Sequence, residues 1–204
     1  MNPIDRLQKL FSRFPGIGAR QSRRFVYFLL HSEPSYLEEL VNELKTIRKK
    51  VAQCPECFRF YENDGHDLCD ICESSKTEGA YLMVVEKDGD IEPIRRSKLY
   101  KGYFFVLGGL VPVVERETPE RIRVNELKKC IEMRAKKNGL KEIILAFSLN
   151  PSGEHTDVYV REILRLIAKS NHLIISSLGR GLSTGSELEY ADNDTIKSAL
   201  ENRK

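Results

Sequence analysis

The sequence predicts an α/β protein built from several modules, and three observations lead to this prediction. Apolar residues recur at helical spacing as far as residue 50, and four of the five cysteines fall between residues 54 and 72. After residue 79, short β-rich apolar runs alternate with helical patterns. We therefore expect a helical N-terminal unit, a small four-cysteine module, a domain with a parallel sheet, and a C-terminal tail of strand and helix.

The overall composition is that of an ordinary globular protein. Of the 204 residues, 41% are hydrophobic and 31% are charged, which argues against intrinsic disorder. No apolar run approaches the roughly 20 residues that span a bilayer, and the N-terminus lacks the apolar core of a secretory signal. We expect a soluble intracellular protein.

The first 52 residues are helical in pattern and basic in charge. Their apolar spacing predicts three or four short helices, with breaks near residues 14–18 and 32–35. The segment holds ten basic and five acidic side chains, an excess of five positive charges, although the whole chain has a net charge of only +3. This segregation suggests that the N-terminal end meets an anion, and a solvated helical surface is the alternative.

A glycine-rich turn lies inside this basic segment, in the sequence Phe-Pro-Gly-Ile-Gly at residues 14–18. Gly16 and Gly18 allow a tight turn whose backbone N–H groups, at the start of a helix, attract anions. Arg20, Arg23 and Arg24 follow and add positive charge around the turn. The pattern is typical of a helix-hairpin-helix motif, which holds DNA phosphates without reading bases, although an ordinary helix–helix turn would also contain such glycines. A nucleotide-binding loop is disfavoured because no strand precedes the glycines and no Gly-Lys-Ser/Thr follows.

The cysteine cluster predicts a metal site. Two Cys-x-x-Cys pairs are separated by eleven residues and consist of Cys54, Cys57, Cys69 and Cys72. Such pairs close a tetrahedral Zn²⁺ site with no open position, so we expect one structural zinc ion per chain rather than a catalytic one. A redox dithiol is disfavoured because neither pair opens a helix after a buried strand. His66 is expected to be exposed, and Cys130 is expected to be a small core residue.

The remainder of the chain predicts βαβ units. Strands are expected at residues 81–85, 103–107, 143–147 and 173–175, with helices at about 124–137 and 156–168 between them. A last helix is expected at residues 192–200, with Asp192, Asn193 and Asp194 as candidate caps.

A third group of candidate site residues follows the predicted strands. Directly after the first strand come three acids, Glu86, Asp88 and Asp90. The strand at residues 143–147 is followed by Asn150, Ser152 and Glu154. Both groups would meet at the carboxyl edge of the sheet, where α/β proteins bind ligands. The second group is too poor in carboxylates for a two-metal Mg²⁺ site, so a metal or partner contact and ordinary polar surface loops both stay open as interpretations.

The order of these modules resembles the RecR family of bacterial recombination mediators over essentially the whole chain. The resemblance rests on the hairpin at residues 14–18, the four cysteines, and a series of short stretches: Val84-Val-Glu86 with Asp90-Ile, Val106-Leu-Gly-Gly109, Asn150-Pro with Gly153-Glu154-His-Thr156, Arg180-Gly-Leu, and Glu187-Leu-Glu-Tyr-Ala-Asp192. The chain departs from the family pattern in a shorter run at residues 150–154, in residues 113–117, and at Ser183, where proline is common.

The resemblance implies the following domains: a helix-hairpin-helix unit at residues 1–52, a four-cysteine zinc finger at 53–76, a Toprim domain with a Rossmann-like parallel sheet at 77–177, and a C-terminal segment with oligomer contacts at 178–204. Catalytic Toprim enzymes carry Asp-x-Asp where this chain has Asn150-Pro-Ser152, so a non-catalytic use is implied. An Mg²⁺-dependent Toprim nuclease or primase is the alternative, and a monomeric DNA-binding zinc protein is a second one.

The resemblance also implies function and partners. The family binds DNA independently of sequence, assembles into rings that are typically tetramers, and with RecO and RecF helps to load RecA recombinase onto gaps coated by single-strand-binding protein. By resemblance, Gly16, Gly18, Arg20, Arg23 and Arg24 would face DNA. Glu86, Asp90 and Glu154 would contact partners. A cytoplasmic, nucleoid-associated location would follow.

Overall fold

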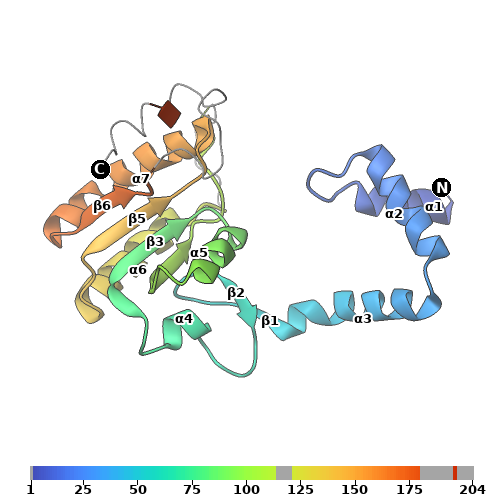
Figure 1. The fold of residues 1–204 in the computed structure, drawn as a ribbon, viewed down its shortest axis with the longest axis horizontal. Coiled ribbons are helices and arrows are strands. Elements are labelled where there is room, and N and C mark those ends of the chain that lie inside the picture. The colour runs from blue at the N-terminus through green and yellow to red at the C-terminus, as the bar shows by residue number, and fades with distance from the viewer. Residues whose placement is uncertain (1, 114–120, 180–194, 197–204) are drawn as a thin grey trace. The chain divides into compact units, whose positions relative to one another are not determined.

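The computed structural model describes residues 2–113, 121–179 and 195–196, and it divides the chain into two compact units, residues 1–52 and 53–204 (Figure 1). The predicted helix at residues 192–200, the stretches at 180–182 and 187–192, and Ser183 lie outside the described residues, except that Thr195 and Ile196 are helical. None of the described helices is both long and apolar enough to cross a membrane.

The N-terminal unit consists of the helices α1 (Pro3–Phe11), α2 (Ala19–His31) and α3 (Pro34–Lys50), which confirms the helical prediction. The start of α1 is fixed by its own residues. The Asn2 side chain accepts a hydrogen bond from the Asp5 N–H at 2.9 Å, and Pro3 occupies the first turn. α1 packs on α2 through an edge-to-face contact of Phe11 with Phe25. Among the described residues of this unit, only Ser22 and Val26 are buried.

The cysteine module follows directly. The strands β1 (Val51–Gln53) and β2 (Phe60–Glu62) form a two-stranded sheet, and the short helix α4 (Asp70–Glu73) completes the module. The module lies along the main sheet, because the backbone N–H of Val106 donates to the carbonyl oxygen of Cys57 at 2.8 Å. This contact pairs part of an edge strand that would otherwise be free.

The main sheet contains β3 (Glu78–Val85), β4 (Gly102–Val106), β5 (Glu142–Ala146) and β6 (Ile174–Ser177) in the order β4-β3-β5-β6, all parallel (Figure 1). The predicted strands are therefore confirmed, and β3 begins three residues earlier than the expected residue 81. Val85 pairs with Val106 on one side and with Ala146 on the other. The carboxyl ends of the three strands thus lie level with one another.

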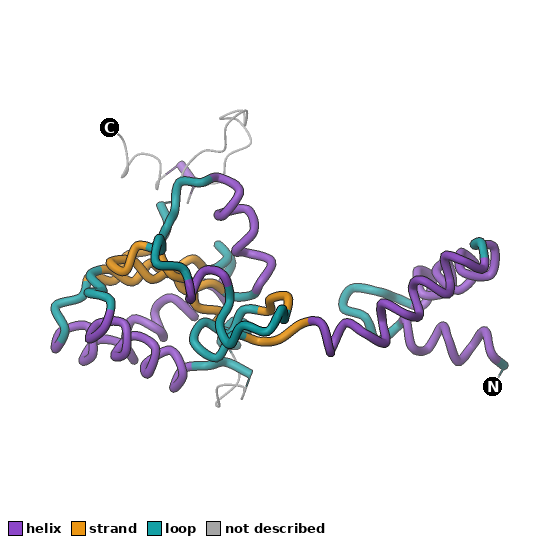
Figure 2. The backbone as a smooth tube through the Cα atoms, turned by 90° about the horizontal axis from the view of Figure 1, so that it is seen from below, coloured by secondary structure: helices purple, strands orange, loops and turns teal. Residues whose placement is uncertain are grey.

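Helices cover both faces of this sheet (Figure 2). After a 3₁₀ turn (Asp88–Asp90), α5 (Ile91–Ser97) packs on the face that carries Met83, Val85 and Phe104. The opposite face packs against α6 (Val124–Lys137) and α7 (Pro151–Ser170) in the larger core cluster. The alternation of side chains along β3 produces these two cores.

α6 has the predicted bounds, whereas α7 begins five residues before the expected residue 156. Asn150 caps α7, since its side-chain oxygen accepts a hydrogen bond from the Gly153 N–H at 2.8 Å, and Pro151 opens the first turn. The expectation that Ser152 and Glu154 lie in a loop after the strand is therefore wrong, because both belong to the first turn of α7.

Candidate nucleic-acid interface and metal centre

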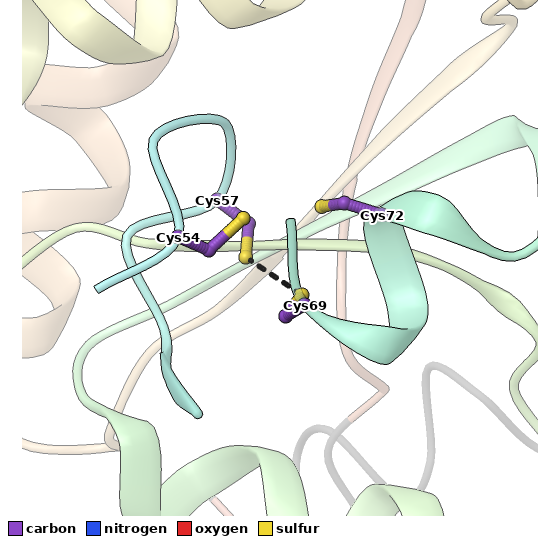
Figure 3. A group of neighbouring side chains, drawn as sticks. All are labelled: Cys54, Cys57, Cys69 and Cys72. Carbon is purple, nitrogen blue, oxygen red and sulfur yellow. Dashed lines mark hydrogen bonds between the residues drawn. The ribbon is translucent and has the colours of Figure 1, made fainter. Parts of the chain in front are cut away.

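The four predicted cysteines come together in a buried cluster. Their sulfur atoms all lie within 4.8 Å of one another, and the Sγ atoms of Cys57 and Cys69 are 3.6 Å apart (Figure 3). The first pair lies in a tight turn in which the Phe58 N–H donates to the Cys54 carbonyl oxygen at 2.9 Å. The second pair begins and occupies α4, because Cys69 precedes its first turn and Cys72 lies within it.

The chemistry of this cluster fits a divalent metal ion. Hydrogen bonds from the other three thiols, above all that of Cys57, lower the pKa of Cys54. The hydrogen bond with Cys54 raises the pKa of Cys69, but those with Cys57 and Cys72 outweigh it and bring the value to about 6. Cys72 remains a donor, chiefly to Cys54, and its pKa is raised. Without a cation, the four thiols therefore resist full ionisation, because each thiolate repels the next. A cation that binds all four as thiolates would neutralise this repulsion.

Two arginines beside the cluster were missed by sequence reasoning. Arg134 of α6 is 1% exposed, donates to the Cys72 sulfur at 3.3 Å and to Glu56 at 3.0 Å, and places its guanidinium 3.6 Å from the centre of the Tyr103 ring. Arg59 is also buried and forms an ion pair with Asp70. Arg134 falls on the apolar stripe of α6, and a charged residue at such a core position is the sequence feature that could have identified it.

The glycine-rich turn presents an open surface in the N-terminal unit. Gly16 has a φ of +73°, which favours glycine, and a Cβ on Gly16 or Gly18 would meet nothing within 4 Å. Gly18 caps α2, whose first turn contains no acid. The backbone N–H groups at this helix start therefore face a site without negative side chains in the turn itself.

The three predicted arginines of α2 differ in their contacts. Arg20 and Arg24 are exposed and lie one helical turn apart. Arg23 is exposed as well, but its Nε donates to the Gln8 side chain of α1 at 3.3 Å. Arg20 and Arg24 are thus the better placed of the three to bind an external anion.

The acidic residues at the carboxyl edge serve different purposes. Glu86 follows β3 and accepts a hydrogen bond from the Ser148 hydroxyl at 3.1 Å. Asp88 accepts from the Phe60 N–H at 2.7 Å, and Asp90 accepts from the Lys87 N–H at 3.0 Å. Asp88 and Asp90 therefore hold local structure, whereas Glu86 remains at the edge.

Glu154 lies at a cavity of about 200 Å³ at the same edge, together with Ser148, Asp157 and Ser177. Within the described residues, the only group of three or more side chains placed to ligate a metal is the cysteine cluster. Glu86, Asp90 and Glu154 thus form no such group there.

A network between α7 and β6 was also missed. Arg161 donates to Asp157, to the Ser177 hydroxyl, and to the Ile175 carbonyl oxygen at 2.8 Å. The Ser177 hydroxyl in turn donates to Asp157. The spacing of Asp157 and Arg161 at i,i+4 was visible in the sequence, but their contact with β6 was not.

Comparisons with known proteins agree with this architecture. Residues 80–177 match the family model described as Toprim domain, and residues 181–204 match the one described as RecR, C-terminal. Similar proteins named Recombination protein RecR include those of Rickettsia felis (34% identical, covering 100% of this chain and 96% of the relative), Gloeobacter violaceus (32%, 99% and 97%) and Paenarthrobacter aurescens (30%, 94% and 91%). Since these similarities extend over nearly the full length of both chains, the protein belongs to the RecR family of recombination proteins, as the sequence motifs predicted.

Proposed function

We propose that this chain is a non-enzymatic mediator of recombinational DNA repair that binds DNA through the hairpin at residues 14–18. The observation that carries the proposal is the exposed pair of glycines followed by Arg20 and Arg24 on an acid-free helix start. Phosphate oxygens accept hydrogen bonds from such backbone N–H groups, and the arginines supply charge-assisted bonds. Binding of this kind is independent of sequence and weakens steeply with salt.

The metal in this proposal is one structural zinc ion per chain. Four thiolate ligands suit Zn²⁺ and leave no position for substrate. Bound zinc would hold two segments together that have little apolar content of their own. Its role is therefore to stabilise the cysteine module and its packing on the sheet.

The partners in this proposal are RecO and RecF, with RecA recombinase loaded as the outcome. Glu86 and Glu154 supply negative charge at the carboxyl edge, while the carboxylate of Asp90 holds the turn behind Glu86. A ring of several chains, with a tetramer as the favoured size, is supported by the apolar side chains on the N-terminal unit. Phe28, Leu30 and Leu44 are each more than half exposed, and such surfaces are typical of protein interfaces.

An Mg²⁺-dependent Toprim nuclease or primase is the less favoured alternative. Asn150 caps α7, and Ser152 stands where a second carboxylate would be needed. Metal-assisted phosphoryl transfer normally uses several carboxylates around the ions. Nicking or primer synthesis that required Mg²⁺ and was lost in Glu86→Gln would favour this alternative.

The DNA-binding proposal is tested by the paired substitution Arg20→Gln with Arg24→Gln. Loss of two phosphate contacts is expected to reduce the slope of log affinity against log salt by about 1.8 for duplex DNA. Fluorescence anisotropy with a labelled duplex measures this slope. Arg48→Gln with Lys49→Gln on α3 removes the same charge and is the matched control. Equal slopes for the two variants would contradict the role of the hairpin.

A further inference from the structure

We propose that the edge of the sheet at which the strands begin is a second DNA-binding surface, which contacts the phosphate backbone. This inference rests on the proposed DNA-binding function, and it assigns a second contact outside the hairpin. The surface is defined by seven exposed lysines in the last turns of helices and in the segments that lead into the strands: Lys76, Lys98, Lys101, Lys136, Lys137, Lys141 and Lys169. We call it the amino-edge surface.

Backbone hydrogen bonds bring the starts of the strands into one row. The carbonyl oxygen of Lys101, before β4, accepts from the Glu78 N–H of β3 at 2.9 Å. The Lys141 N–H, before β5, donates to the Ala80 carbonyl oxygen of β3 at 2.9 Å. The Lys141 carbonyl oxygen accepts from the Ile174 N–H of β6 at 2.9 Å. Four strands at a spacing of about 4.8 Å make this row about 14 Å long.

The ends of two helices extend the row. A Cβ on Gly79 would lie 2.3 Å from the carbonyl oxygen of Asn138, so the end of α6 closely approaches the start of β3. Lys136 and Lys137 occupy that last turn of α6. The Leu173 N–H donates to the Ala168 carbonyl oxygen at 2.9 Å, which folds the end of α7, with Lys169, toward β6.

Within the described part of the chain, the seven lysines are not neutralised by ion pairs. None of them forms an ion pair with any residue that the structure describes. The acids at the same strand starts are Glu78, which is exposed, and Glu142, which is half-buried and accepts a hydrogen bond from Ser176. The seven lysines of this surface therefore outnumber the two glutamates at the strand starts.

The favourable interaction of cations with the C-terminal ends of helices explains the positions of only some of these lysines. Lys136, Lys137 and Lys169 lie in last turns, where the helix dipole favours cations. Lys76, Lys101 and Lys141 lie in connecting segments, where that effect is absent. Lys98 ends α5 with a φ of 58°, a conformation that favours glycine or asparagine, and Leu99 next to it is 90% exposed. A lysine with this backbone conformation, beside an exposed tip, is consistent with an external contact.

The opposite edge of the same sheet carries more acids, although Lys87 and Arg161 pair with two of them, Glu86 and Asp157. Acids there include Glu86, Asp88, Asp90, Glu154 and Asp157. A polyanion would therefore approach the sheet domain from the amino edge. A B-form duplex carries about eight phosphate charges over a length of about 14 Å, which is enough to engage the whole row.

The test uses the full-length, metal-loaded protein and a fluorescein-labelled duplex of about 30 base pairs. The variant Lys98→Gln with Lys101→Gln and Lys141→Gln removes three charges from the amino-edge surface. The matched control removes three charges elsewhere on the same unit, by Lys128→Gln, Lys129→Gln and Arg165→Gln. Anisotropy titrations from about 50 to about 300 mM salt give the slope of log affinity against log salt. We expect the slope to fall by about 2 to 3 in the amino-edge variant and by less than about 0.5 in the control.

The outcomes separate this inference from the proposed function. If the amino-edge variant and the control have the same slope while Arg20→Gln with Arg24→Gln weakens binding, DNA contacts the hairpin alone and the inference is wrong. If the unsubstituted protein binds no duplex at about 50 mM salt, the proposed function and the inference are both overturned. Thermal melting curves of both triple variants that match the unsubstituted protein show that any change in slope is due to charge rather than unfolding.

Discussion

At the scale of single residues, Arg134 connects the cysteine cluster to the sheet domain. Its guanidinium bonds to the Cys72 sulfur and to Glu56, and it stacks on Tyr103. Four thiolates around a divalent ion carry two negative charges, and a buried cation beside them offsets part of that charge. Glu56 is partly exposed, so the contact with the sulfur is the more strongly desolvated of the two.

Replacing Arg134 by methionine is expected to weaken both the fold and metal retention. The substitution keeps an apolar stem and removes the buried charge, so we expect the free energy of unfolding to fall by about 3 kcal/mol. We also expect faster transfer of the metal to a chelator. Urea unfolding and an absorbance-based chelator assay measure the two effects. Arg165→Met, at an exposed position on α7, is the control and should change neither.

Replacement of Gly153 by alanine is expected to destabilise the protein, although glycine-to-alanine substitutions in helices usually stabilise. Glycine-to-alanine substitutions within helices normally stabilise by about 1 kcal/mol. Here the added Cβ would lie 1.8 Å from the Ser148 carbonyl oxygen, so Gly153→Ala should destabilise by at least about 2 kcal/mol in chemical unfolding. Gly89→Ala is the control, because its Cβ would meet nothing within 4 Å. Stabilisation by Gly153→Ala would show that the start of α7 adjusts freely.

At the scale of elements, the stability of the cysteine module is expected to depend on the proposed zinc ion. β1, β2 and α4 are three, three and four residues long, and elements this short contribute little stability of their own. Cys72→Ser is therefore expected to reduce bound zinc from about one ion per chain to well below one, as measured by elemental analysis. Cys130→Ala removes a buried thiol that lies outside the cluster, and it should retain the full metal content.

Some of these elements could be predicted from the sequence and others could not. The strands and α6 were predictable because β-rich apolar runs and apolar residues at helical spacing identify buried elements directly. The start of α7 was not, since Pro151, Ser152 and Gly153 resemble a loop until the cap of Asn150 is known. α5 was missed because it is only seven residues long and contains Pro93. The cysteine cluster followed from spacing alone, whereas the role of Arg134 needed the three-dimensional neighbours of α6.

At the scale of the whole molecule, the N-terminal unit exposes much of its apolar surface. A hollow of about 550 Å³ is lined mainly by aromatic and aliphatic side chains, including Phe28, Tyr36 and Leu40. Burial of such a surface would stabilise an assembly by about 25 cal/mol for each Å² removed from water. The proposed ring would provide that burial.

Phe28→Glu is accordingly expected to shift the protein toward smaller assemblies. Phe28 is 58% exposed, so the substitution should cost little in the folding of a single chain but much at an apolar contact. A concentration series in light scattering measures the change in mass. Leu166→Glu, at an exposed position on α7, is the control. Equal masses for both variants and the unsubstituted protein would argue against assembly through this surface.

The hydrogen bond from Val106 to Cys57 bears on the fate of the protein in the cell. It places the metal-binding turn along the outer side of β4, at the end of the sheet. A chain that lost the proposed zinc ion would release this turn and leave the Val106 N–H, on an apolar strand, without this partner. Such an edge recruits strands from other chains. Metal starvation should therefore remove this protein by aggregation and proteolysis, so that its supply would follow the zinc status of the cell.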